Sequence, residues 1–197
     1  MRYAAAAERL SSLATFPGTL PEGPAALMPE FTDGRLRPRL DQAASARPAA
    51  VLVLVFPGPD DEARLVLTER PSYDGFHSGE VSFPGGKAEP EDLDEDATAL
   101  RESAEEIGLD PAAAGVRIVG HLGDVWIPVS DFRITPVVGL AARRPVLTPS
   151  PDEVARILEP PVAAFLPDAP IEMVERTIRD WPLRYGGYRI DDLHVWG

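Results

Sequence analysis

Runs of apolar residues separated by turn-forming residues predict short strands arranged around one long helix. A run rich in β-branched residues at 49–56 ends at Pro57-Gly58, which is typical of a buried strand. An acidic turn follows, and the next apolar run is predicted to be its hairpin partner. The strands are predicted at residues 49–56, 64–69, 81–83, 116–126, 133–141, 171–179 and 193–196. Short helices are predicted at residues 4–13 and 161–166.

The best-defined predicted element is a helix from about Glu95 to Ile107. Apolar residues recur there at helical spacing and predict one buried stripe, made of Leu93, Ala97, Leu100, Ala104 and Ile107. Gly108 follows at the position where a left-handed cap ends many helices. Strands before, between and after few helices predict an α+β fold, a mixed sandwich rather than a doubly wound parallel sheet.

Residues 1–48 differ in composition from the rest of the chain. They contain the first predicted helix and then a Pro- and Gly-rich arm, for example at Pro17-Gly18. A chain of 197 residues is long enough for one well-cored domain with modest extensions. We therefore interpret residues 1–48 as an N-terminal extension and residues 49–197 as the domain.

The charge balance is acidic, with 32 Asp and Glu against 19 Lys and Arg and a net charge of -13. A nucleic-acid partner is not expected, because phosphate contacts need a basic face. A small phosphorylated substrate remains compatible if a metal ion supplies positive charge. The absence of cysteine excludes disulfides, thiolate metal sites and a cysteine nucleophile. The longest apolar run is of strand length, and the first residues lack the apolar core of a secretion signal. We therefore expect a cytoplasmic protein without a membrane partner.

Three glutamates on the predicted helix form the first candidate site. Glu102, Glu105 and Glu106 occupy positions i, i+3 and i+4, which places their carboxylates on one side of a helix. Like charges at this spacing repel, whereas carboxylate oxygens are the ligands that Mg²⁺ and Mn²⁺ prefer. Arg101 lies between the two faces, where it can pair with a glutamate and fix its rotamer. The alternative is an ordinary solvated acidic face.

The segment before the helix adds to this pattern. Phe83-Pro84-Gly85-Gly86 ends a predicted strand, and the two glycines let bare backbone approach the acidic helix face. A backbone carbonyl there would add an oxygen ligand. The alternative interpretation of a Gly-Gly pair is a simple turn, so the prediction of a metal platform depends on the turn and the helix together.

These residues resemble a known signature. The run from Arg101 to Leu109, preceded by Gly86, is similar to the Nudix box, whose core reads Arg-Glu-x-x-Glu-Glu-x-Gly. One residue more than usual separates Gly86 from Arg101, Asp92 or Asp94 stands in the region of the first glutamate of the box, and Ser103 replaces a bulky aliphatic residue. The resemblance implies a Nudix-type α/β/α sandwich with a mixed β-sheet and a hydrolase of diphosphate linkages.

A branch of this family, the coenzyme A pyrophosphatases, is similar in further segments. Residues 66–71 and 79–86 resemble its Leu-Leu-Thr-x-Arg and Gly-x-Val-x-Phe-Pro-Gly-Gly runs, which precede a box that is also extended. Pro71 replaces a small residue, and Gly75 stands where a second arginine is expected. Residues 150–154 and 194–197 resemble two later motifs of the branch, so the resemblance covers about 49–197.

The resemblance implies roles for individual residues. Mg²⁺ or Mn²⁺ would be held by Glu102, Glu106, Glu105 and the Gly86 carbonyl, and Arg101 would belong to the catalytic set. Arg70 and His77 would contact the substrate. Either Glu105 or Glu153 would take a proton from water, and the choice between them stays open.

The implied reaction is coenzyme A plus water giving 3′,5′-ADP and 4′-phosphopantetheine. The partner is thus a small nucleotide-diphosphate substrate, and a homodimer is compatible with the sequence. Three alternatives remain open at this point. They are another Nudix specificity such as ADP-ribose or a different nucleoside-diphosphate compound, a non-catalytic Nudix-like binding module, and a structural protein with an acidic helix face.

Overall fold

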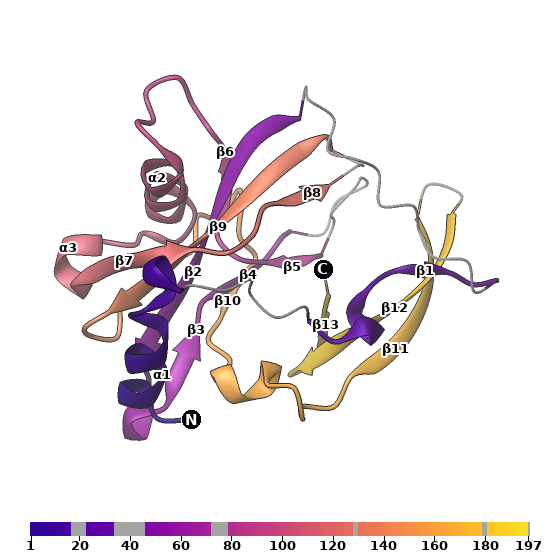
Figure 1. Cartoon of the computed structure of the whole chain (residues 1–197). Coiled ribbons are helices and arrows are strands. Elements are labelled where there is room, and N and C mark those ends of the chain that lie inside the picture. The colour runs from indigo at the N-terminus through magenta and orange to yellow at the C-terminus, as the bar shows by residue number, and fades with distance from the viewer. Residues whose placement is uncertain (17–22, 34–45, 72–78, 128–129, 179–180, 197) are drawn as a thin grey trace. The chain divides into compact units, whose positions relative to one another are not determined.

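The computed structural model describes the chain except for residues 17–22, 34–45, 72–78, 128–129, 179–180 and 197 (Figure 1). Contacts group the chain into two compact units. Unit 1 comprises Met1–Leu20 and Gln42–Val162, and unit 2 comprises Pro21–Asp41 and Ala163–Gly197. The predicted domain boundary after residue 48 stays a prediction.

Unit 1 is built on a mixed sheet with the order β3-β2-β9-β7, in which β6 also pairs with β2 and β8 with β9. The central strands β2 and β9 are parallel, and the other pairs are antiparallel. A smaller sheet has the order β10-β4-β5. The bounds are Arg47–Pro57 (β2), Ala63–Leu65 (β3), Leu67–Glu69 (β4), Val81–Ser82 (β5), Gly85–Lys87 (β6), Val116–His121 (β7), Val125–Ile127 (β8), Phe132–Ala141 (β9) and Arg156–Leu158 (β10).

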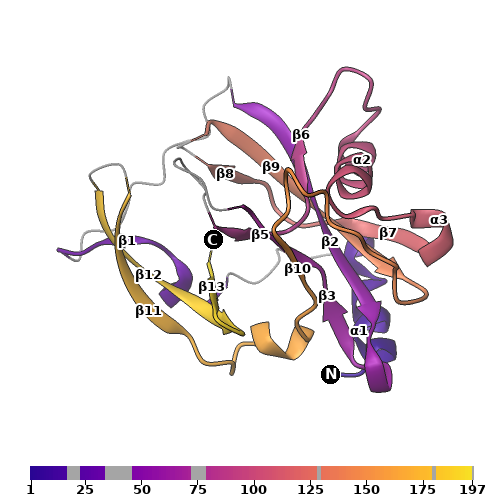
Figure 2. The same cartoon turned by 180° about the vertical axis from the view of Figure 1, so that it is seen from behind.

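Three helices accompany these sheets. Helix α2 (Glu95–Ile107) lies against β2, β6 and β9, whereas α1 (Tyr3–Leu10) lies against β2 and β3 (Figures 1 and 2). Helix α3 (Pro111–Ala114) follows α2, and short 3₁₀ helices cover Leu13–Thr15 and Pro59–Asp61. The largest core cluster joins β2 and β9 to α2 and includes Leu52, Leu54, Phe56, Val137 and Ile107. The predicted α+β class with a mixed sheet is confirmed.

Three predictions for the strands of unit 1 were wrong in detail. The predicted strand at 116–126 is divided into β7 and β8, which pair with different parts of β9. The predicted strand at 64–69 is divided, because β3 pairs with β2 whereas β4 joins the smaller sheet, with the buried Val66 between them. The Gly85-Gly86 pair, predicted as a turn, begins β6 and pairs with β2. Gly85 has φ 151, and any side chain there would collide with the backbone of Ala50, so only glycine allows this approach.

The predicted helix bounds are confirmed, but the predicted apolar stripe is wrong. Leu93 precedes the helix and is 94% exposed, and Ala104 is exposed as well. The buried residues of the helix are Thr98, Ala99, Ser103, Glu106 and Ile107. The hydroxyl of Ser103 donates to the carbonyl of Ala99 at 2.7 Å, which satisfies its polar atom inside the core. The buried face of α2 therefore carries polar groups, including one of the three predicted ligands.

Unit 2 contains an antiparallel sheet with the order β1-β12-β11, and β13 pairs with the far part of β12. Its elements are β1 (Glu30–Phe31), β11 (Glu172–Ile178), β12 (Trp181–Ile190), β13 (Leu193–Val195) and a 3₁₀ turn at Ala25–Leu27. Another 3₁₀ helix, Val162–Phe165, begins at the last residue of unit 1 and continues into unit 2. A short helix was predicted there, at residues 161–166. Strand β12 was not predicted, because Pro182 and Gly186-Gly187 interrupt its apolar pattern. None of the helices in the described residues is long and apolar enough to cross a membrane.

Candidate active site

The backbone of β6 meets two glutamates of α2. The amide N–H of Gly85 donates to Oε2 of Glu106 at 3.0 Å. The Glu102 carboxyl group lies against Gly86 so closely that a Cβ on that residue would be 2.6 Å from it. The predicted approach of bare backbone to the acidic helix face is therefore confirmed. A side chain at this position would have to displace the Glu102 carboxyl group, which occupies the space.

Burial makes negative charge costly on both glutamates. Glu106 is 8% exposed, and its burial raises its pKa to about 7, although the Gly85 amide and the charge of Arg70 act in the opposite direction. Burial also raises the pKa of Glu102, against the stabilising hydrogen bond and charge of Arg101. A cation placed between these carboxylates would favour their ionised forms, which is a property expected of a metal platform.

Arg101 is held by several partners at once. Its Nη1 lies 3.0 Å from a carboxylate oxygen of Glu102 and 3.0 Å from one of Glu105, and its Nη2 donates to the carbonyl of Lys87 at 3.0 Å. The predicted pairing of Arg101 with a glutamate is thus confirmed, and it involves two glutamates. The side chain of Glu105 is 56% exposed, so of the three box glutamates it is the one that faces outward.

The structure distinguishes the two aspartates that the sequence left as alternatives. Asp92 accepts two hydrogen bonds from Arg101, from Nε and Nη2, each at 3.0 Å. It also accepts the amide of Glu89 and the hydroxyl of Thr98, each at 2.9 Å. These donors, Arg101 first, hold the pKa of Asp92 well below its usual range. Asp94 instead caps α2 by accepting the amide of Ala97 at 2.8 Å.

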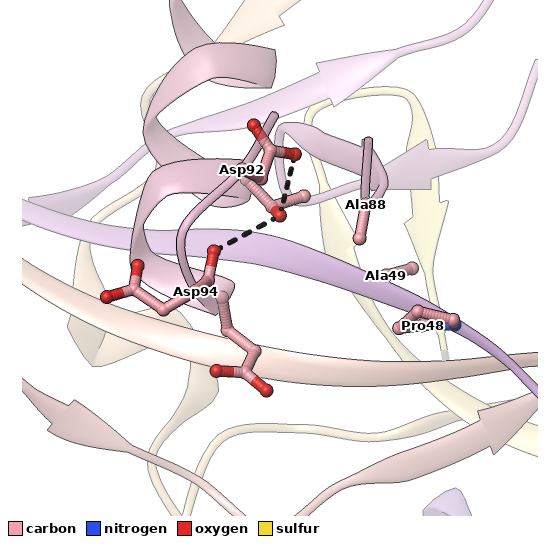
Figure 3. A pocket seen from close by; sticks show the side chains of 7 residues that line it. Pro48, Ala49, Ala88, Asp92 and Asp94 are labelled. Atoms are coloured by element: carbon pink, nitrogen blue, oxygen red, sulfur yellow. Dashed lines mark hydrogen bonds between the residues drawn. The ribbon is translucent and has the colours of Figure 1, made fainter. Parts of the chain in front are cut away.

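A small pocket lies beside these aspartates, at the start of α2 (Figure 3). Thr98 bridges its two sides, since its hydroxyl lies within hydrogen-bond distance of Asp92 and of the carbonyl of Asp94. The lining residues are Pro48, Ala49, Ala88, Asp92, Asp94, Glu95 and Thr98. Neither Thr98 nor the role of Asp92 was identified from the sequence. The sequence did contain one indication. One residue more than usual separates Gly86 from Arg101, and this changes which acid of the segment can reach the arginine.

The loop that carries Glu153 is tied to both sides of the site. The amide of Ser150 donates to the carbonyl of Glu106 at 2.7 Å, and the amide of Ala155 donates to the carbonyl of Glu69 at 2.9 Å. Glu153 lies close enough for its charge to raise the pKa of Glu102 and Glu106. The charges of Arg70, which follows β4, and of Glu153 therefore both act on Glu106 of α2. His77 and Gly75 lie outside the described residues.

The donor set fits a hard divalent cation. It consists of carboxylate oxygens beside the backbone of Gly86, where no side chain intervenes. In the part of the chain that the structure describes, no three His, Cys, Asp or Glu side chains converge closely enough to hold a metal ion as they stand. Arg101 pairs with two of the predicted carboxylate ligands, Glu102 and Glu105. To bind a metal ion, Glu102 and Glu105 would therefore have to release Arg101 or share their carboxylate oxygens between Arg101 and the metal.

Similar proteins of known sequence carry Nudix names. The chain is 46% identical over 122 residues to "Nudix hydrolase 22, chloroplastic" of Arabidopsis thaliana, covering 61% of this chain and 39% of that protein. It is 39% identical over 158 residues to "Nudix hydrolase 15, mitochondrial" of the same plant, covering 76% and 53%. It is 40% identical over 128 residues to "Uncharacterized Nudix hydrolase NudL" of Pectobacterium atrosepticum, covering 65% and 64%. The matches thus span between 39% and 64% of these relatives.

Solved structures of similar fold include the Nudix hydrolase RenU from M. Smegmatis, with a TM-score of 0.49, 23% identity, and coverage of 60% of this chain and 74% of that one. The NUDIX domain of Shewanella oneidensis NrtR, complexed with ADP ribose, has a TM-score of 0.47 and 17% identity, with coverage of 64% and 80%. The NUDIX domain family matches residues 46–170, which is more than half of the chain. The chain therefore belongs to the Nudix family.

Proposed function

We propose that the chain is a Mg²⁺- or Mn²⁺-dependent hydrolase of a diphosphate linkage, with coenzyme A or one of its derivatives as substrate. The products are 3′,5′-ADP and 4′-phosphopantetheine. The observation that carries the proposal is the contact of the Gly85-Gly86 backbone with Glu102 and Glu106, which forms an oxygen-rich platform at the start of β6. Membership of the Nudix family supports the hydrolytic chemistry.

We assign Glu102 and Glu106 as the main metal ligands, with the Gly86 carbonyl and Glu105 completing the set. A metal held there would neutralise the charge of the diphosphate and make bound water more acidic. Arg101 acts through the glutamates, because its hydrogen bonds with Glu102 and Glu105 restrict their rotamers. The Gly85 amide supports the platform as well, because it orients the Glu106 carboxylate.

We assign Glu153, rather than Glu105, as the group that accepts a proton from the attacking water. Glu105 is paired with Arg101 at 3.0 Å, and its side chain is more than half exposed. Glu153 belongs to a loop that is anchored to Glu106 on one side and to the strand before Arg70 on the other. Its charge acts on both buried glutamates, whereas the charge of Glu105 acts on Glu102. A base would have to lie near water held at these two carboxylates, and of the two candidates Glu153 is the one whose charge reaches both.

The coenzyme A assignment has narrower support. The upstream run that ends in Gly85-Gly86 resembles the coenzyme A branch. The charge of Arg70 acts on Glu106, and a guanidinium can bind phosphate oxygens in a bidentate manner. His77 is assigned to the substrate from the resemblance alone. Because Gly75 replaces an expected arginine, competitors of coenzyme A belong in the substrate panel.

The test is to incubate the protein with Mg²⁺ or Mn²⁺ and coenzyme A, ADP-ribose, a dinucleotide or a nucleoside triphosphate, and to identify the products. We expect coenzyme A to be cleaved fastest. Preferred cleavage of ADP-ribose would refute only the substrate, whereas cleavage of none would refute the hydrolase.

Variants test the assigned residues in the same assay. Glu102→Gln or Glu106→Gln should lower turnover at least about a hundredfold while circular dichroism stays unchanged. Glu8→Gln, an exposed acid of α1 outside the candidate site, is the control and should keep wild-type turnover. Near-wild-type rates for both site variants in saturating Mg²⁺ would refute the metal assignment. Glu153→Gln should lower turnover more than Glu105→Gln, and the reverse order would refute the choice of base.

A further inference from the structure

Strand β11 in unit 2 is an exposed edge strand. Each of its residues pairs with β12 on one side, from Glu172 opposite Gly187 to Ile178 opposite Trp181. On its other side, no strand pairs with it among the described residues. Residues 172–177 include none that is buried, and only Val174 is half-buried. Met173 is 50% exposed. The strand therefore presents one edge and nearly all its side chains to its surroundings.

An edge of this kind carries unpaired amide and carbonyl groups that can template another strand. Proteins commonly block such edges with proline, with charged side chains, lysine above all, or with a bulge. Strand β11 contains neither proline nor lysine, and its pairing with β12 runs without a shift of register. Its charged residues Glu172, Glu175 and Arg176 include both signs. Its backbone is thus regular enough to accept a further antiparallel strand.

The side chains of β11 indicate which strand fits. Two copies of one strand pair antiparallel about a twofold axis perpendicular to the sheet, and this axis keeps each residue on its own face. Two residues that face each other across the axis must therefore be the same residue or lie an even number of positions apart. A register is called centred on the residue that lies at the axis and faces its own copy. The register centred on Glu175 places two glutamates opposite each other, and the register centred on Arg176 places two arginines opposite each other. Both are unfavourable, because like charges directly opposite destabilise a sheet.

A register centred on Val174 gives the opposite result. Val174 then faces Val174 of the second copy, and Glu172 faces Arg176 twice, once on each side of the axis. These three residues lie on one face, since their partners on β12 are Gly187, Tyr185 and Leu183. The strand is therefore complementary to itself in apolar contact and in charge. Glu172 also pairs with Arg189 at 3.0 Å within its own chain, so it would be shared between two arginines.

We propose that β11 pairs antiparallel with β11 of a second copy of this chain, in the register centred on Val174, to form a homodimer with one continuous sheet. The site lies in unit 2 and does not depend on the hydrolase assignment. It gives the segment after residue 163 a role in assembly.

The experiment measures the mass of the full chain by analytical ultracentrifugation over a range of concentrations. We expect the wild type to dimerise and Arg176→Glu to weaken the dimer about tenfold or more, because both opposite-charge pairs become like-charge pairs. Glu172→Arg should weaken it in the same way. An equal mixture of the two variants should form heterodimers, since both acids of the one variant then face both arginines of the other.

Glu175→Gln is the matched control, because residue 175 faces Met173 in this register, and it should leave the dimer unchanged. Retained circular dichroism shows that each variant folds. A wild type that is monomeric at every concentration overturns the proposal. A dimer that Arg176→Glu leaves intact also overturns it. So does a monomer whose β11 amides are protected from hydrogen exchange, because the edge of β11 would then be covered within its own chain.

Discussion

The surroundings of α2 and the sheet of unit 2 both contain arginine–carboxylate pairs, but in different environments. Around α2 the Asp92 side chain is 7% exposed and that of Arg101 28%, and each group has several partners. In unit 2, Arg184 is 48% exposed where it pairs with Glu30, and Arg189 is 53% exposed beside Glu172. Charge pairs restrict geometry where water is excluded and several hydrogen bonds act together, whereas exposed pairs contribute little.

The largest effect is expected at Gly86, in the buried region. In Gly86→Ala the new methyl group would lie 2.6 Å from the Glu102 carboxyl, so either the carboxylate or β6 must move. We expect turnover to fall about a hundredfold, because a misplacement of about 1 Å at a reacting site can have an effect of this size. Gly123→Ala is the control, since nothing lies within 4 Å of its added Cβ. Equal turnover of the two variants would show that the approach of β6 to α2 is not needed.

The next largest effect is expected at Asp92. Asp92→Asn removes the charge that binds Arg101 in two places, so Arg101 should shift toward Glu102 and Glu105. We expect turnover to fall roughly tenfold to a hundredfold, as for other residues that orient metal ligands. Asp94→Asn should retain activity, because asparagine also caps a helix. A larger loss for Asp94→Asn would reverse the assignment of the two aspartates.

A smaller effect concerns the pH dependence of the metal-free protein. The pKa of Glu106 rises from 4.5 to about 7 in the folded protein, so the native state binds a proton more tightly than the unfolded state. Its stabilising contribution is complete below pH 4.5 and is lost as the pH rises through 7. The melting temperature in chelator should therefore decline over this window more steeply for the wild type than for Glu106→Gln. Saturating Mg²⁺ should reduce the difference between the two proteins. If the melting temperatures of both proteins followed the same pH dependence without metal, burial would not raise the pKa of Glu106 as stated.

The smallest effect is expected in unit 2. Glu30→Gln removes the partner of Arg184, whose Nε donates to Glu30 at 2.9 Å on an exposed surface. Water and salt screen this pair, so the melting temperature and the turnover should both stay close to those of the wild type. A loss of stability comparable to that of Gly86→Ala would mean that the exposed pair supports the sheet, and the contrast between the two regions would no longer hold.

Prediction from the sequence succeeded where local pattern and local structure agree. The bounds of α2, the αL cap at Gly108 and the long strand 49–56 were predicted from spacing and turn residues, and the structure contains all three. It failed where tertiary contacts override local pattern. Leu93 has the right spacing for the apolar stripe but precedes the helix, and Glu106 has a charge but is buried. Strand β12 was not predicted because Pro182 and Gly186-Gly187 interrupt its apolar pattern, and its pairing with β1 and β11 depends on segments that are distant along the chain.

By itself, the sequence predicted a candidate site of three carboxylates on one helix face. The spacing of Glu102, Glu105 and Glu106 puts three carboxylates on one helix, and two glycines before them indicate a close approach of backbone. Only the tertiary structure decided which acid pairs with Arg101, which glutamate faces outward, and that Glu153 comes to the same place. The physical reason is that helical spacing follows from neighbouring residues, whereas hydrogen bonds and burial depend on segments that are distant along the chain.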